Sequence, residues 1–206
     1  MNGVSGTRSL RSVEEQLARV LDAVRVLEIE TLAVADSAGR TLAEPATAAF
    51  DIPLFDNSAM DGFAVRAADV AAATAMNPVA LSVVADLPAG VSGDPSLGPG
   101  DAARIMTGAP TPTDADAIVP FEDTAGGLAD SLGEVRVLRA PAKPGAFIRR
   151  RGADLRTGDE VVPAGDRVGA FQVAAVVAAG ISRLTVTRAP RVAVVSTGSE
   201  LLAPGE

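Results

Sequence analysis

The segment Pro53–Val65 reads PLFDNSAMDGFAV, and it holds many polar side chains inside an apolar frame. Four hydrogen-bonding residues fall within six positions: Asp56, Asn57, Ser58 and Asp61. Asp, Asn, Ser and Gly are common turn formers, which favours a structural turn whose side chains bond their own backbone. A rigid polar loop on an apolar base is also how ligand-orienting groups are mounted, so the density favours a binding loop. The residues alone leave both interpretations open.

The chain around this segment predicts a compact β domain from about residue 50 to 143. Short apolar or alternating runs are separated by clusters of Gly, Pro and Asp, which is the pattern of strands joined by turns. The predicted strands are ALSVVADL (80–87), AARIMTG (102–108), DAIVPFEDT (116–124) and GEVRVLRA (133–140).

Helices are predicted on both sides of the β domain. Ser12 and Glu15 form a capping-box pattern, and apolar residues then recur at three- and four-residue steps, which predicts an amphipathic helix over about 13–26. A second helix is predicted over 169–180, where the final glycine is typical of a C-cap. A short helix is predicted around Gly39–Ala43, because a proline follows closely and stops it.

The segment Arg191–Gly198 (RVAVVSTG) is β-branched and continuously apolar, which predicts a strand buried on both faces of a parallel sheet. Such a strand needs a crossover helix and parallel neighbours, and the chain stops at Glu206 before either can form. We therefore expect a truncated sequence that holds only the start of an α/β domain. The residues at the end of the strand would lie where open α/β folds bind ligands. They are Ser196, Thr197, Gly198 and Glu200.

The composition excludes several classes of protein. The 206 residues carry a net charge of −8 and only 3% aromatic residues, whereas nucleic-acid binders use a basic face and stacking platforms. No nucleic-acid partner is therefore expected. The chain has no Cys and no His, which excludes zinc, haem and serine-histidine chemistry and leaves hard cations such as Mg²⁺ held by oxygen atoms. No run has the length and apolarity of a signal peptide or membrane span, so we expect no membrane association and a soluble cytoplasmic protein.

Two further segments carry candidate anion contacts. In RIMTGAPTP (104–112), Thr107 offers a hydroxyl and a backbone amide at a turn, although the pattern is also an ordinary strand exit. In IRRRGADLRTGDE (148–160), three arginines beginning at Arg149 favour oxyanion recognition, with Asp154 nearby to orient them. Surface ion pairs with the abundant carboxylates explain the same arginines equally well.

In their order and spacing, these segments resemble the molybdopterin molybdenumtransferase family, of the MoeA and gephyrin E-domain type. PLFDNSAMDGFAVRAAD is similar to the family's most distinctive run, and RIMTGAPTP, FIRRRGADLRTGDEV and VAVVSTGSEL resemble its next landmarks. The resemblance implies a mixed α/β fold that is multidomain and elongated. Its parts would be a discontinuous first domain (1–49 and 144–190), an inserted mostly-β domain (50–143) and the truncated start of an α/β molybdopterin-binding domain (191–206).

The resemblance also implies a function in molybdenum cofactor biosynthesis. Members of the family work as homodimers that take adenylylated molybdopterin and molybdate, release AMP in a Mg²⁺-dependent step and leave molybdenum on the dithiolene. We expect this 206-residue chain to be inactive on its own, because the family's further metal ligands and pterin-binding loops would lie beyond its last residue.

Site residues follow from the resemblance position by position. The catalytic carboxylates would be Asp61, Asp154 and Glu200. The residues that bind substrate or oxyanion would be Asp56, Asn57, Ser58, Thr107, Arg149, Ser196, Thr197 and Gly198. Two positions depart from the family, because Ser199 stands where many members carry aspartate and Phe63 where many carry tyrosine.

Two other classes of function fit the same sequence. One is a non-catalytic scaffold or molybdopterin-binding interaction module, and the other is a regulatory protein that binds the pterin and transfers nothing. Three converging carboxylates, Asp61, Asp154 and Glu200, favour an enzyme, since a scaffold has no need of them. Release of AMP would separate an enzyme from a regulatory protein.

Overall fold

The computed structural model describes residues 10–126 and 132–198, together with Glu200, Leu202 and Gly205. The chain divides into two compact units. The first unit comprises Met1–Ala46, Val162–Val177 and Ile181–Glu206, and the second comprises Thr47–Val161 and Ala178–Gly180. The domain limits expected from the sequence, at 49/50, 143/144 and 190/191, stay a prediction.

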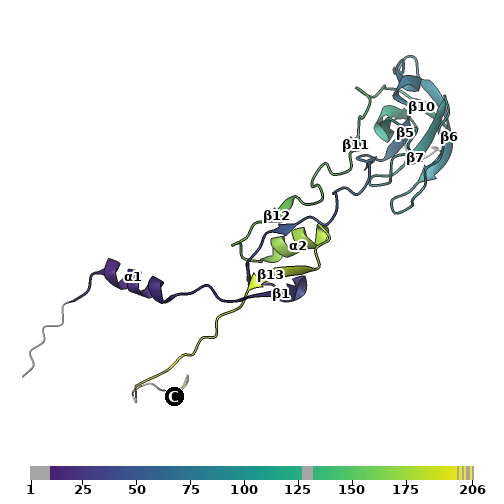
Figure 1. Ribbon diagram of the computed structural model, residues 1–206. Coiled ribbons are helices and arrows are strands. Elements are labelled where there is room, and N and C mark those ends of the chain that lie inside the picture. Colours follow the sequence, from purple (N-terminus) through teal and green to yellow (C-terminus); the bar gives the residue numbers. More distant parts are fainter. Residues whose placement is uncertain (1–9, 127–131, 199, 201, 203–204, 206) are drawn as a thin grey trace, which may run out of the picture. The chain divides into compact units, whose positions relative to one another are not determined.

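A three-stranded antiparallel sheet in the order β1-β13-β2 forms the centre of the first unit (Figure 1). Its strands are β1 (Ile29–Ala33), β2 (Thr41–Leu42) and β13 (Arg183–Thr187). The central strand comes from far along the chain and lies between two strands of the N-terminal segment. Alternation along β13 turns Leu184 and Val186 inward, and both are buried.

The two α-helices expected from the sequence are confirmed. Helix α1 (Val13–Ala23) starts with the predicted capping box, since Ser12 Oγ accepts from Glu15 N at 3.1 Å and Glu15 Oε2 accepts from Ser12 N at 3.0 Å. It ends about one turn earlier than expected, and none of its residues is buried. Helix α2 (Ala170–Ala178) is followed by Gly180, whose φ of 78° is the left-handed conformation of a helix end.

The short helix expected around Gly39–Ala43 is wrong. A 3₁₀ turn, η1 (Val34–Asp36), comes before this segment, and Gly39 has a φ of 80° that no right-handed helix accepts. Leu42 then lies in β2, is buried, and donates its N–H to Asp166 O at 2.9 Å. Long-range strand pairing decides the conformation of this segment, so there is no helix for the nearby proline to stop.

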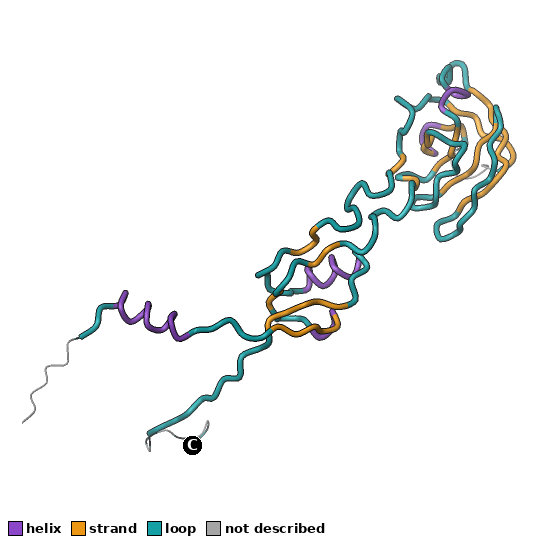
Figure 2. The backbone as a smooth tube through the Cα atoms, viewed as in Figure 1, coloured by secondary structure: helices purple, strands orange, loops and turns teal. Residues whose placement is uncertain are grey.

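The second unit is built on a six-stranded sheet in the order β8-β5-β7-β6-β10-β9, which is strongly curved (Figures 1 and 2). The strands are β5 (Gly62–Val65), β6 (Val79–Leu87), β7 (Asp101–Ile105), β8 (Ala117–Pro120), β9 (Thr124–Ala125) and β10 (Gly133–Val137). Two 3₁₀ turns, η2 (Ala67–Val70) and η3 (Phe121–Asp123), lie between them. The four strands predicted from the sequence are confirmed, and β6 and β7 pair in parallel while the other pairs are antiparallel.

Both faces of this sheet are covered along β5. Phe63 and Val65 belong to one apolar cluster and Ala64 belongs to another, as expected from the alternation of a strand. Phe63 packs edge-to-face on Phe121, with ring centroids 5.3 Å apart and planes at 85°. The phenyl ring at position 63 is fully buried, so the chain uses it as a core residue.

Short ladders complete the described strands: β3 (Ala46–Thr47) pairs with β12 (Glu160–Val162), and β4 (Asn57–Ser58) with β11 (Ile148–Arg149). The strand expected over Arg191–Gly198 is wrong for this structure, which has no regular structure there and leaves Val192, Val194 and Val195 exposed. A continuously apolar strand forms only between parallel neighbours, and no described strand pairs with it. The observed fold is mostly β with two α-helices, and no helix of the described part is long and apolar enough to cross a membrane.

Candidate functional site

Three segments far apart in the sequence meet in the second unit. The segment 56–61 contains β4, the segment 106–111 follows β7, and the segment 147–151 contains β11. Ser58 N donates to Ala109 O at 3.0 Å, and Gly108 N donates to Ser58 O at 2.9 Å. On the other side, β4 and β11 pair antiparallel. We call these three segments the polar junction.

The polar side chains of β4 hold the junction together. Asn57 is buried; its Oδ1 accepts from Arg149 Nε at 2.9 Å and its Nδ2 donates to Phe55 O at 3.1 Å. Ser58 is fully buried and donates its Oγ hydrogen to Met60 O. Both side chains therefore make their hydrogen bonds to other groups of the protein, which is what the structural-turn interpretation of this loop predicts. Contact of either residue with a substrate stays a prediction.

The side chain of each arginine in the run 149–151 donates to a different partner in the segment 51–58, and Arg151 N donates to Asp56 Oδ1 at 2.8 Å. Arg149 uses Nε and one terminal nitrogen to bind Asn57 Oδ1 and Ser58 O, the second at 3.3 Å. Arg150 pairs with Asp56 Oδ2 at 2.5 Å, and Arg151 Nε pairs with Asp51 Oδ2 at 2.7 Å. Two of the three arginines thus form the surface ion pairs that the sequence left as an alternative. Arg149 alone has no carboxylate partner among the described residues.

Asp61 lies at the edge of the junction, just before β5. Its Oδ1 accepts from Thr107 N at 2.6 Å, and this hydrogen bond, followed by one from the Thr107 side chain, lowers the pKa of the Asp61 carboxyl. Its side chain is exposed to solvent. The structure therefore brings Asp61 and Thr107 together, with an ionised carboxylate open to solvent.

Asp154 lies on a turn after β11. Its N–H donates to Ile52 O at 2.9 Å, which fixes the backbone, while its exposed carboxylate has no hydrogen-bond or ion-pair partner in the part of the chain that the structure describes. An unpaired carboxylate on a fixed backbone can take up a proton, bind a metal ion or accept a hydrogen bond from a donor group. Its role as a catalytic residue stays a prediction.

The remaining predicted site residues belong to the first unit. Ser196, Thr197 and Glu200 are exposed and lie in irregular chain, and a Cβ on Gly198 would come within 2.2 Å of Glu200 Oε1. Their contact with the substrate site stays a prediction. Ser199 lies outside the described residues.

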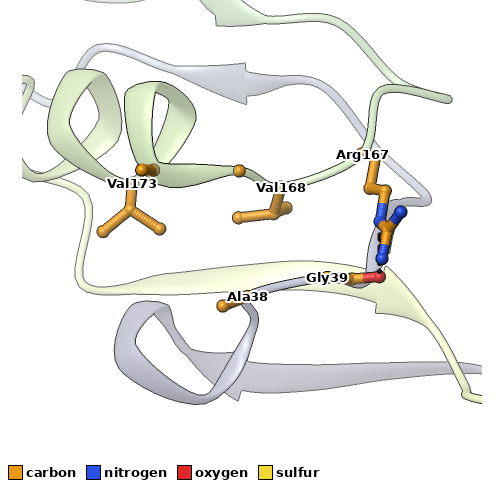
Figure 3. A pocket seen from close by; sticks show the side chains of 7 residues that line it. Ala38, Gly39, Arg167, Val168 and Val173 are labelled. Atoms are coloured by element: carbon orange, nitrogen blue, oxygen red, sulfur yellow. Dashed lines mark hydrogen bonds between the residues drawn. The ribbon is translucent and has the colours of Figure 1, made fainter.

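Two hollows of the first unit contain none of the predicted site residues. One, of about 610 Å³, lies between the turn at Ala38–Gly39 and the start of α2 (Figure 3). Val168 and Val173 line it, and Arg167 Nε donates to Gly39 O at 3.3 Å beside it. The other, of about 440 Å³, is lined mainly by residues 24–27, 39–41 and 187–190. Both are largely apolar and offer no set of groups for chemistry.

We expect acid to weaken the polar junction. The pKa of Asp56 is lowered below its ordinary value of 3.8, first by the hydrogen bond from Arg151 N, and that of Asp61 by Thr107 N. A carboxyl whose pKa is lowered by folding stabilises the fold above its unfolded pKa, and this stabilisation is lost as the pH falls through the folded value. The melting temperature of the protein should therefore decrease when the pH is lowered below about 4.

Thermal unfolding followed by circular dichroism at pH 6 and pH 3 checks this expectation. The variant Asp56→Asn should melt below the parent at pH 6, and the difference should become smaller at pH 3, because protonation begins to remove the same charge from the parent. An equal difference at both pH values would contradict the assigned role of this carboxylate.

Sequence reasoning overlooked Asp51, which binds Arg151 and both donors of Thr157. The three arginines were the available signal, since three adjacent cations in an acidic chain require partners. It also overlooked Phe147, which has a φ of 56° and accepts from Ala59 N at 2.8 Å beside β4. Such a backbone costs a non-glycine residue about 1–2 kcal/mol, and no sequence pattern marks it.

Comparison with known proteins places these observations in a family. The model of the MoeA N-terminal region (domain I and II) matches residues 11–180. Molybdopterin molybdenumtransferase 2 of Mycobacterium tuberculosis is 44% identical over 196 residues, or 95% of this chain and 47% of the relative. Molybdopterin molybdenumtransferase of Nostoc sp. is 40% identical over 195 residues, or 95% of this chain and 43% of the relative.

The solved structures agree with these relatives. The crystal structure of the molybdopterin biosynthesis MoeA protein from Pyrococcus horikosii superposes with a TM-score of 0.76 at 37% identity, covering 93% of this chain and 48% of that protein. The chain spans about half the length of the relatives it matches. These matches confirm the resemblance drawn from the sequence.

Proposed function

The chain belongs to the MoeA family of molybdopterin molybdenumtransferases, and on that premise we propose that the full-length protein inserts molybdate into adenylylated molybdopterin with release of AMP. One observation carries the proposal: the family match extends through every segment of the polar junction, at 44% identity to a relative of that name. This reaction would place the protein in molybdenum cofactor biosynthesis.

The polar junction supplies groups that suit oxyanion substrates. Molybdate and the phosphates of an adenylyl group carry negative charge, which guanidinium and amide donors recognise. The terminal nitrogen Nη1 of Arg149 has no protein acceptor within the described residues, so it remains available to such an anion. In this proposal Thr107 contributes its hydroxyl, Asp56, Asn57 and Ser58 shape the loop, and Asp61 and Asp154 act as catalytic carboxylates.

Mg²⁺ is part of the proposal. No group of three acidic side chains that could hold a metal ion occurs among the described residues. Mg²⁺ is commonly bound by one or two carboxylates together with substrate phosphates, and this mode fits the open carboxylates of Asp61 and Asp154. The ion would neutralise phosphate charge, while these residues would hold it and accept hydrogen bonds.

For the architecture of the full-length protein, we propose that an α/β molybdopterin-binding domain begins near Arg191. This domain would carry Ser196, Thr197, Gly198 and Glu200 towards the substrate. We also propose a cytoplasmic homodimer. The exposed apolar residues of the first unit support an assembly, because large unpaired apolar surface marks interaction sites. They include Leu17, Leu21, Val192, Val194 and Val195.

An assay of the full-length protein with adenylylated molybdopterin, molybdate and Mg²⁺ tests the function. We expect AMP release that depends on molybdate and stops when EDTA removes the metal, with activity restored by added Mg²⁺. Binding of the pterin without AMP release would instead indicate a regulatory protein. Absence of both would support the scaffold alternative.

A further inference from the structure

Asp51 holds both ends of one turn in the second unit. Its Oδ2 accepts from Arg151 Nε at 2.7 Å. Its Oδ1 accepts from Thr157 N at 2.9 Å and from Thr157 Oγ1 at 3.0 Å. The Asp51 side chain is only 21% exposed, whereas that of Arg151 is 65% exposed. A single carboxylate therefore braces a turn of seven residues at its first and last positions.

The braced turn contains Asp154. Its backbone is bonded to the residues that follow Asp51: Gly152 N donates to Pro53 O at 3.0 Å, and Asp154 N donates to Ile52 O at 2.9 Å. Leu155 N and O complete the pairing with Ile52 O and N at 3.1 and 2.7 Å. These bonds fix where the backbone of the turn lies, and the Asp154 carboxylate projects from it without a partner in the described chain. Asp56 Oδ1 also accepts from Arg151 N at 2.8 Å, so both carboxylates hold the first position of the turn, and Asp51 also joins it to the last.

We propose that Asp51 is a positioning residue of the transferase site, which acts by bracing the turn 151–157 so that the Asp154 carboxylate is held in one place. The proposal rests on the proposed function, because Asp154 is a catalytic residue only if that function holds. Asp51 itself is occupied by Arg151 and Thr157, so it is not expected to contact substrate. Displacement of a reacting group by about 1 Å costs about 100-fold in rate, so a brace of this kind affects turnover more than binding.

Two substitutions separate the two ends of the brace. Asp51→Asn keeps an oxygen for Thr157 but places an amide donor against the Arg151 donor, so it releases only the first end. Asp51→Ala removes the hydrogen bonds of Asp51 at both ends, while Arg151 N keeps its hydrogen bond to Asp56 Oδ1 at 2.8 Å. Asp94 offers a matched control, because its carboxylate accepts from Thr113 N and Thr113 Oγ1, both at 2.8 Å, in the same unit and away from the turn.

Hydrogen exchange on the full-length protein tests the brace without any assay of activity. In Asp51→Ala, the amides of Gly152, Asp154 and Leu155 should exchange at least about tenfold faster than in the parent, because the turn opens more often. Asp51→Asn should give an intermediate change, and Asp94→Ala should leave these amides unchanged. Unchanged exchange in Asp51→Ala overturns the proposal.

Turnover then tests whether the brace acts through Asp154. Asp51→Ala should lower kcat about tenfold or more, with KM for adenylylated molybdopterin within about twofold of the parent. In an Asp154→Ala background the same substitution should cost little further, since residues that act together are not additive. An equal loss in both backgrounds overturns the positioning role. If the unsubstituted protein releases no AMP, the proposed function fails, and the exchange experiment still decides whether Asp51 braces the turn.

Discussion

Asp61→Ala is expected to lower AMP release by the full-length protein about 100- to 1,000-fold, the usual loss when a group that stabilises a transition state or transfers a proton is removed. Asp61 is exposed, and hydrogen bonds from Thr107 N and from the Thr107 side chain lower its pKa. Its negative charge is thus maintained at neutral pH and is accessible to a metal ion or substrate. Asp61→Asn should show nearly the same loss, because the amide keeps the acceptor for Thr107 but not the charge.

Asp94→Ala is the matched control for this prediction. Both carboxylates are exposed, and both have a pKa lowered by the backbone N–H and the hydroxyl of a threonine. The two substitutions should change the melting temperature alike, whereas only that of Asp61 should reduce turnover. Steady-state rates and thermal melts of the two variants measure this difference. Full activity of Asp61→Ala would show that this carboxylate has only a structural role and is not part of the proposed site.

Gly62→Ala is expected to destabilise the second unit by about 3 kcal/mol, because overpacking of a close backbone contact cannot relax as a side chain can. Gly62 pairs with Ile105 of β7 and Pro120 of β8. A Cβ at this position would lie 2.1 Å from Val119 O and 2.9 Å from Pro120 Cα. The clash involves backbone atoms of β8, the edge strand that pairs with β5, so β5 and β8 would have to separate.

Denaturant unfolding of Gly62→Ala and Gly93→Ala measures this effect. The nearest atom to a Cβ at Gly93 is Leu87 Cδ2 at 3.4 Å, a tight contact with the end of a flexible side chain, so the control should stay within about 0.5 kcal/mol of the parent. For Gly62→Ala the melting temperature should fall by roughly 10 °C. Equal stability of both variants would mean that β5 and β8 adjust more easily than their geometry indicates.

Local signals in the sequence predicted the local structure well. The capping box of Ser12 and Glu15 predicted the first residue of α1, since both of its hydrogen bonds lie within one turn. Alternation and turn residues predicted β6, β7, β8 and β10 for the same reason: each strand carries its own periodicity. The family resemblance added a function and a set of residues, and the comparisons confirm the family.

Sequence reasoning failed where distant segments decide the conformation. The conformation of residues 39–43 is decided by strand pairing with β13 and by a hydrogen bond to Asp166, which lie more than a hundred positions away. The apolar run 191–198 has the composition of a buried strand, yet composition cannot supply the neighbours that a strand must pair with. The candidate site shows the same limit, because Asp51 and Arg151 are 100 positions apart.

By itself, the sequence determined the chemistry that this protein has at its disposal. A chain without Cys or His, with Asp56, Asp61 and Asp154 beside a run of arginines, is restricted to oxygen ligands, carboxylates and guanidinium groups. Only the tertiary structure decided how these groups are used. It paired Arg150 and Arg151 with Asp56 and Asp51, and it left the carboxylates of Asp61 and Asp154 exposed to solvent. The physical reason is that hydrogen bonds and ion pairs act over about 3 Å in space, whereas a sequence specifies only which groups exist and how far apart they lie along the chain.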